Sequence, residues 1–74
     1  MKNTIRVKCI EGFTLHNYNF TKLLAEVEKK EYDAQLYIET EEYFAKDLKG
    51  REFLVGEINI DRKLVLGQDF KLIK

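Results

Sequence analysis

Apolar and polar residues alternate over residues 4–9, which is the pattern of a β-strand that buries one face. Ile5, Val7 and Cys9 share the apolar side, and the residues between them are polar. The segment therefore predicts a first strand in which Cys9 is buried as a small apolar side chain rather than exposed as a reactive thiol.

The next apolar residues have the spacing of a helix. Phe20, Leu23, Leu24 and Val27 stand at i, i+3, i+4 and i+7, so they form one apolar stripe at 3.6 residues per turn. Asn and Thr side chains just before this stripe can cap a helix, and two lysines suit its last turn. This spacing predicts a helix over residues 20–30.

A second strand and a second helix are predicted in the middle of the chain. Residues 34–39 alternate between apolar and polar, as a strand does. Thr40 is then a suitable N-cap and Gly50 suits the left-handed residue after a helix, so residues 41–49 predict a short helix. The aromatic pair at 43–44 is also compatible with a strand that continues.

The last third of the chain predicts a three-stranded antiparallel meander. Three-residue loops at 61–63 and 67–69 would place six apolar side chains on one face of this meander. The six are Ile58, Ile60, Leu64, Leu66, Phe70 and Leu72.

The same pattern predicts the register of the meander. Ile60 is expected opposite Leu64, and Ile58 opposite Leu66, because two-residue loops would bring charged side chains onto the apolar face. Gly56 is expected to mark a bulge, since the apolar residues before it are out of phase with those after it.

The predicted order is therefore β-α-β-α-β-β-β. It indicates a single α+β domain over residues 1–74, with a mostly antiparallel sheet that ends in the meander and both helices on one face. Seventy-four residues leave no room for a second domain, and 45% apolar with 35% charged residues is ordinary for a globular protein.

The residue inventory excludes most catalytic and metal chemistry. The chain has no serine, one histidine and one cysteine, which excludes serine nucleophiles, intramolecular disulfides and cysteine-based zinc sites. The glycines stand singly, so there is no phosphate-binding loop, and the carboxylates of Glu41 and Glu42 would diverge on a helix. We expect no enzymatic activity, no cofactor and no metal.

Membrane and export signals are also missing from the pattern. There is no run of about 18 apolar residues and no apolar core of a signal peptide. A single cysteine suits a reducing compartment. We therefore expect a cytoplasmic protein without a membrane partner.

Charge is unevenly distributed, although the net charge is zero. Residues 26–47 carry eight carboxylates and three lysines, a net charge of −5, together with three tyrosines. One interpretation is a surface that docks on a basic protein, because tyrosine offers contact area and complementary charge speeds association. The other is a solvated helix face without a partner. The candidate contact residues are Tyr37, Glu39, Glu41, Glu42 and Tyr43.

The basic residues form a second candidate surface. Arg6 and Lys8 lie on the polar face of the first strand, and Lys63 and Lys71 lie on that of the meander. If these strands are adjacent, their outer face carries a basic stripe able to contact nucleic-acid phosphates. The alternative is the Lys and Arg lining of an ordinary solvated sheet.

Two segments carry a resemblance to a known group of proteins. Residues 7–15 (VKCIEGFTL) and 36–50 (LYIETEEYFAKDLKG) resemble strands and a capped short helix of small uncharacterised proteins encoded by phages and prophages of Gram-positive bacteria. The meander from Gly56 onward departs from that group. The resemblance implies a mobile-element origin and a bacterial host cell, and it carries over no catalytic residue.

Three functions are therefore under consideration. The expected one is a small phage or mobile-element factor that binds and modulates or inhibits a host protein complex through the acidic surface. The first alternative is a structural or assembly protein of a phage particle, with sheet edges pairing between copies. The second alternative is a nucleic-acid-binding domain that uses the basic stripe.

Overall fold

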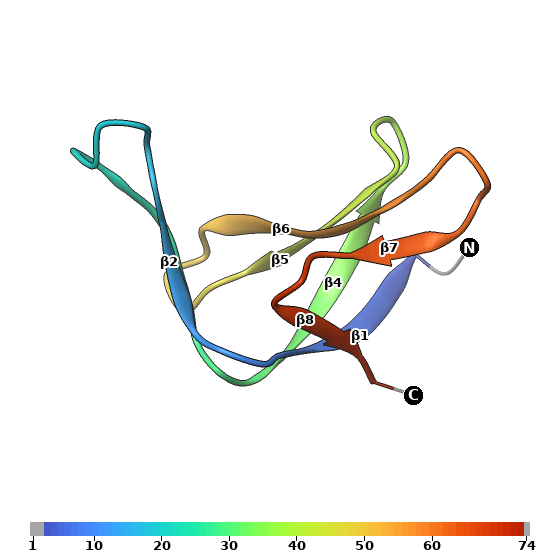
Figure 1. Ribbon diagram of the computed structural model, residues 1–74, viewed down its shortest axis with the longest axis horizontal. Helices are drawn as coiled ribbons and strands as arrows, with labels where there is room; N and C mark the ends of the chain where they lie inside the picture. Colours follow the sequence, from blue (N-terminus) through green and yellow to red (C-terminus); the bar gives the residue numbers. More distant parts are fainter. Residues whose placement is uncertain (1–2, 74) are drawn as a thin grey trace.

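Eight β-strands and no helix make up residues 3–73, the part of the chain that the computed structural model describes (Figure 1). The predicted α+β class is therefore wrong, and the domain is all-β. In chain order the strands are β1 (Thr4–Cys9), β2 (Phe13–His16), β3 (Leu23–Val27), β4 (Glu31–Tyr37), β5 (Glu42–Lys46), β6 (Glu52–Ile58), β7 (Leu64–Leu66) and β8 (Phe70–Leu72).

Six of the strands form one antiparallel sheet in the order β7-β6-β5-β4-β1-β8. The sheet curls until its edge strands, β7 and β8, come close together, which produces a nearly closed barrel (Figure 1). β2 and β3 form a separate hairpin between β1 and β4; its base packs on the core through Ala25 and Val27, and its turn end extends away from the sheet (Figure 1). We call residues 13–27 the arm.

The first predicted helix, over residues 20–30, is β3 with its flanking turns. Leu23, Ala25 and Val27 alternate with polar residues, so a strand pattern coexists with the helical stripe in the same residues. Pairing with β2 and burial of Ala25 and Val27 select the strand. Phe20, the first residue of the helical stripe, is instead exposed in the turn.

The second predicted helix, over residues 41–49, is β5 and the turn after it. The strand alternative at residues 43–44 was correct, and the predicted cap Thr40 lies in the turn between β4 and β5. Gly50 does have the left-handed backbone expected of it, with φ of 77°, but it serves the β5–β6 turn. Tertiary pairing on both sides of β5 overrides the local cap signals.

The predicted meander is correct for its first hairpin only, and with a different register. Ile58 lies opposite Leu64 and Gly56 opposite Leu66, which is two residues away from the predicted pairing. A two-residue shift keeps every side chain on its predicted face, because the side-chain period of a strand is two. The predicted burial of Ile60 is wrong, since it is 96% exposed in the longer β6–β7 loop.

The third strand of the predicted meander joins the other end of the sheet. β8 pairs with β1, so that Cys9 lies opposite Phe70 and Val7 opposite Leu72. Phe70 and Leu72 therefore do not form the predicted ladder with β7. This pairing brings the two ends of the sheet together, and burying an edge strand removes unpaired backbone groups.

The bulge predicted at Gly56 is confirmed. Val55 is an extra residue of β6 opposite the step between Tyr43 and Phe44 of β5, where the register shifts. A Cβ atom at Gly56 would lie 2.7 Å from the carbonyl oxygen of Val65, so glycine allows β6 and β7 to approach closely.

The inward-facing side chains form one core. The Phe53 ring lies edge-on to Tyr32 at 5.1 Å and stacks on Phe70 at 5.9 Å between ring centroids. Cys9 is fully buried, which confirms its predicted place in the core. The other buried apolar residues are Val7, Ala25, Val27, Ala34, Tyr43, Ala45, Val55 and Ile58.

Candidate functional site

The structure separates the five predicted contact residues into three environments. Tyr37 and Glu42 are opposite each other on β4 and β5 and point away from the core. Glu39 and Glu41 lie in the turn between these strands. Tyr43 points inward and is only 1% exposed, so its ring belongs to the core and is not part of an outer surface.

Cross-strand pairing adds side chains that the sequence did not single out. Phe44 lies opposite Leu54 on the outer side of β5 and β6, and Glu42 lies opposite Glu57. We call six outward residues of β4, β5 and β6 the acidic outer face: Tyr37, Glu42, Phe44, Glu52, Leu54 and Glu57. The other outward residues of these strands are Glu31, Asp33, Gln35 and Lys46, and Lys46 lies opposite Glu52.

An apolar strip runs across the acidic outer face. The Tyr37 ring lies against Phe44, with 4.8 Å between ring centroids, and its hydroxyl donates a hydrogen bond to a carboxylate oxygen of Glu52. Leu54 continues the strip and is about half exposed. Because the hydroxyl is held by Glu52, the Tyr37 ring has a defined position over the sheet.

A shallow hollow of about 250 Å³ opens beside this strip. Asp33 and Glu52 contribute carboxylates to its lining, Lys46 contributes an ammonium group, and Tyr37 and Phe44 contribute rings. A mixed lining of rings and charged groups, with two carboxylates and one ammonium group, can accept an apolar group that brings a positive charge with it.

Two carboxylates of the face lie directly opposite each other without a cation. Glu42 and Glu57 are cross-strand partners, and within residues 3–73 no ion pair involves either of them. Like charges in this position destabilise a sheet. Among residues 3–73 the pair is therefore a negative charge without a compensating cation, in the cross-strand row next to Phe44 and Leu54.

Other carboxylates of the acidic segment are already occupied. Glu41 accepts a hydrogen bond from Arg62 at 2.6 Å, and its backbone carbonyl accepts one from the N–H of Ile58 at 2.8 Å. These contacts connect the β4–β5 turn to the β6–β7 loop. Glu41 therefore has an ion-pair partner, whereas Glu42 has none among residues 3–73.

The structure does not bring the four residues of the predicted basic stripe together as one surface of free positive charge. Arg6 is paired with Glu31 at 2.9 Å and with Asp33 at 2.8 Å, so its charge is compensated. Lys8 and Lys71 do lie opposite each other on β1 and β8. Lys63 is in the β6–β7 loop, and β7 does not pair with β1. Two of the four predicted residues thus remain side by side.

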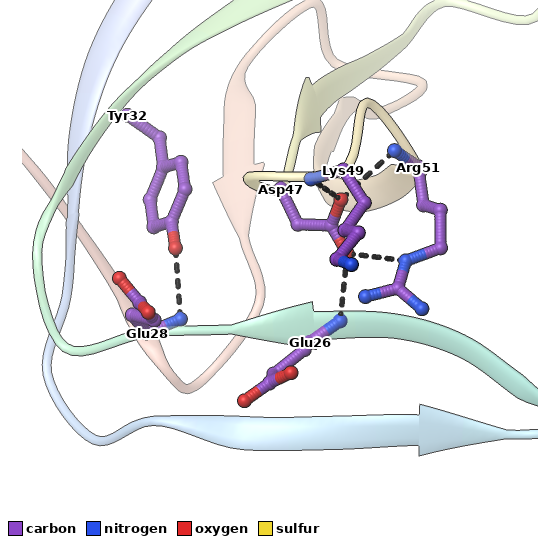
Figure 2. A network of polar contacts seen from close by, with 6 residues as sticks. All are labelled: Glu26, Glu28, Tyr32, Asp47, Lys49 and Arg51. Carbon is purple, nitrogen blue, oxygen red and sulfur yellow. Dashed lines mark hydrogen bonds and ion pairs between the residues drawn. The ribbon is translucent and has the colours of Figure 1, made fainter.

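Asp47 holds the most highly connected polar group among the described residues (Figure 2). Its buried carboxylate accepts four hydrogen bonds: from the N–H groups of Glu26, Lys49 and Arg51 at 2.9 Å each, and from Nε of Arg51 at 2.7 Å. Burial alone raises the pKa of Asp47, but the four donors outweigh it and hold the pKa well below its ordinary value.

This network fixes the base of the arm. The N–H of Glu26 is bound by Asp47, and the N–H of Glu28 donates to the hydroxyl of Tyr32 at 2.8 Å (Figure 2). Sequence reasoning counted Asp47 only as one charge of the acidic segment. The available signal was its position three residues before Gly50, which is typical of a turn.

Comparisons with known proteins do not assign a function to this site. No protein-family model, no curated protein and no solved structure matches the chain. Within the described part of the chain, no helix has the length and apolar character needed to span a membrane. The resemblance to phage-encoded proteins stays a prediction.

Proposed function

We propose that this protein is a non-catalytic binding module that docks a basic, partly apolar protein surface on its acidic outer face. In the setting implied by the resemblance, it is a phage or mobile-element factor that modulates a protein complex of its bacterial host. The observation that carries the proposal is the Glu42–Glu57 pair, whose charge no cation among the described residues compensates, beside the exposed strip of Tyr37, Phe44 and Leu54.

The opposed carboxylates of Glu42 and Glu57 favour binding of a cation. Two carboxylates directly opposite on a sheet cost about 0.2–1 kcal/mol relative to a neutral pair. A Lys or Arg side chain of a partner would remove this cost and form charge-assisted hydrogen bonds. The same partner would cover Phe44 and Leu54, and burial of apolar area supplies the main attraction.

The apolar strip and the charges have different expected roles. Rings at the centre of an interface mainly set the dissociation rate, because they are the groups most fully removed from water. Exposed carboxylates mainly set the association rate and its dependence on salt. Tyr37 already has its hydroxyl held by Glu52, so it loses little freedom on binding.

Affinity capture from a bacterial lysate with matched baits tests the proposal. The baits are the wild type, a face variant with Glu42→Gln and Glu57→Gln, and a control with Glu11→Gln and Asp61→Asn. Both variants lose two carboxylates on outward-facing side chains, but only the first loses them from the acidic outer face. We expect a basic protein that the wild type and the control retain and the face variant loses.

Binding rates of the captured protein, once purified, complete the test. The face variant should associate more slowly than the control at low salt, with a weaker dependence on ionic strength. Equal association rates, or the absence of any protein that distinguishes the baits, would overturn the proposal. Loss of binding in a variant with Lys8→Ala and Lys71→Ala instead would favour the nucleic-acid or basic-surface alternative.

A further inference from the structure

The end of the arm exposes two aromatic rings in a protein whose other aromatic side chains mostly lie in or near the core. Residues 17–22, which we call the tip, connect β2 to β3 at the point farthest from the sheet (Figure 1). Tyr18 is 95% exposed and Phe20 is 77% exposed. Leu15 and Leu24, on the strands beside the tip, are also partly exposed.

The Asn and Thr side chains of the tip are bound to one another and to its backbone rather than directed outward. Oδ1 of Asn17 accepts the N–H groups of Thr21 and Lys22 at 2.9 and 3.1 Å, and its Nδ2 donates to the Thr21 hydroxyl. That hydroxyl donates to Oδ1 of Asn19 at 2.8 Å. Since these groups already have partners, covering the tip with another surface removes little hydrogen bonding to water.

Phe20 occupies a backbone conformation that disfavours its own side chain. Its φ is 58°, in the left-handed region where glycine or asparagine is expected and a bulky residue is strained. Its ring contacts His16, at 5.5 Å between ring centroids, and otherwise projects into solvent. Strain retained at an exposed aromatic residue is typical of a contact surface.

The arm also differs in charge from the rest of the chain. Residues 12–25 contain no carboxylate and one lysine, Lys22, although 35% of the whole chain is charged. The other highly exposed apolar side chains of the described residues stand beside a carboxylate: Ile38 and Ile60 are each followed by one, and Leu48 follows Asp47. The tip is thus an exposed apolar surface that can approach an acidic partner without like-charge repulsion.

We propose that the tip of one copy of this protein docks on the acidic outer face of a second copy. The inference rests on the proposed function, because it assigns an occupant to the same face. Tyr18 and Phe20 would cover the strip formed by Phe44 and its neighbours, and Lys22 would supply the cation that the opposed carboxylates lack. The two surfaces are complementary both in apolar area and in charge.

The direction of the arm makes this contact intermolecular. Hydrogen bonds from the N–H groups of Glu26 in β3 and Glu28 just after it tie the base of the arm to Asp47 and Tyr32 (Figure 2). The tip extends away from its own sheet (Figure 1), so it is directed towards a neighbouring molecule. In a contact between a tip and a face, each end member keeps one unused surface. Such head-to-tail contacts extend into chains or close into rings, rather than stopping at a symmetric dimer.

Sedimentation velocity of the full chain tests the inference, over concentrations from about 10 µM to about 1 mM. A tip variant carries Tyr18→Ala and Phe20→Ala, and a charge-reversed variant carries Glu42→Lys and Glu57→Lys; Glu42 is partly buried and the other three positions are exposed. We expect the wild type to grow beyond a dimer and each variant to dissociate at least about tenfold more readily. Circular dichroism verifies that each variant keeps its β-fold.

Mixing the two variants is the decisive measurement. The tip variant keeps an intact face and the charge-reversed variant keeps an intact tip, so the mixture should form a one-to-one dimer and nothing larger. A monomeric wild type at the highest concentration overturns the inference. So does association that persists in the charge-reversed variant, which would indicate contacts between tips or between sheet edges.

The inference and the proposed function fail separately. If the wild type stays monomeric but the baits still distinguish a captured partner, only the inference fails and the proposed function stands. If no lysate protein distinguishes the baits while the mixed variants still form their dimer, the face serves contacts between copies only, as in the assembly alternative.

Discussion

The carboxylate of Asp47 accepts a hydrogen bond from the backbone N–H of Glu26 at 2.9 Å, across 21 positions of the chain. Glu26 belongs to β3 in the arm, and Asp47 follows β5 in the barrel. The same carboxylate holds the β5–β6 turn through Lys49 and Arg51. One side chain therefore couples the position of the arm to the main sheet.

Replacement of Asp47 by asparagine should lower thermal stability and loosen the arm. The amide cannot offer two charged acceptor oxygens, so some of the buried N–H donors lose their partner. Thermal unfolding should show a lower Tm, and amide hydrogen exchange at Glu26 should accelerate. Asp33→Asn, which removes an exposed ion pair with Arg6, is the control and should change Tm little.

The contribution of Asp47 should also depend on pH in a defined direction. Its pKa is lower in the folded chain than its ordinary value of 3.8, so its stabilisation is complete above that value and is lost as the pH falls further. The stability gap between wild type and Asp47→Asn should therefore narrow below about pH 4. A gap that stays constant down to acid unfolding would contradict the assigned role.

Glu57→Gln should stabilise the isolated protein while weakening docking. The substitution removes the repulsion with Glu42, for which we expect a gain of about 0.2–1 kcal/mol in the free energy of unfolding. Urea unfolding at low salt measures the gain, and added salt should reduce it. Glu31→Gln, which breaks an ion pair with Arg6, should show no such gain.

Phe20→Asn should likewise raise stability at the expense of association. Asparagine tolerates a φ of 58° better than phenylalanine does, so we expect a gain of up to about 1 kcal/mol. Tyr18→Asn is the control, because Tyr18 lacks a positive φ and its stability should stay nearly unchanged. Unfolding and sedimentation measured on the same samples would separate the two effects. If the Phe20→Asn variant is less stable than the wild type, the Phe20 ring contributes to the stability of the fold.

Cys9 should react slowly with thiol reagents in the native protein and rapidly after denaturation. Burial raises the pKa of its thiol, and Sγ donates a hydrogen bond to the carbonyl oxygen of Glu11 at 2.9 Å. Both features keep the thiolate population low. Labelling with a chromogenic disulfide, with and without denaturant, measures the ratio of rates. Fast native labelling would place Cys9 at the surface.

Local alternation was enough to locate β1, because a period of two can be recognised from consecutive residues alone. It found β4 with displaced ends, since the strand predicted over residues 34–39 spans Glu31–Tyr37 and Ile38 is exposed in the turn after it. Val7 and Cys9 are buried as predicted, and so is the inward side of β4 at Ala34. The bulge at Gly56 was also readable, since a change of phase within one strand leaves its mark in the sequence.

The helices failed for a specific reason. Between residues 20 and 27 the apolar residues satisfy a helical period and a strand period at once, with Leu23 and Val27 common to both. The choice depends on which neighbour can cover them, and here β2 supplies a paired strand. A short helix without a matching surface has little stability of its own.

The candidate site was found only in part from the sequence. Tyr37 and Glu42 were predicted contacts, whereas Tyr43 was counted with them although strand parity turns it into the core. Leu54 and Glu57 reach the same surface only because the register of β5 and β6 sets them beside Phe44 and Glu42. Composition and alternation indicate whether each residue prefers burial or exposure, and both can be read from neighbouring residues in the sequence. Which carboxylates meet a cation, and which meet each other, follows from strand order and register, since charges interact through distances in space.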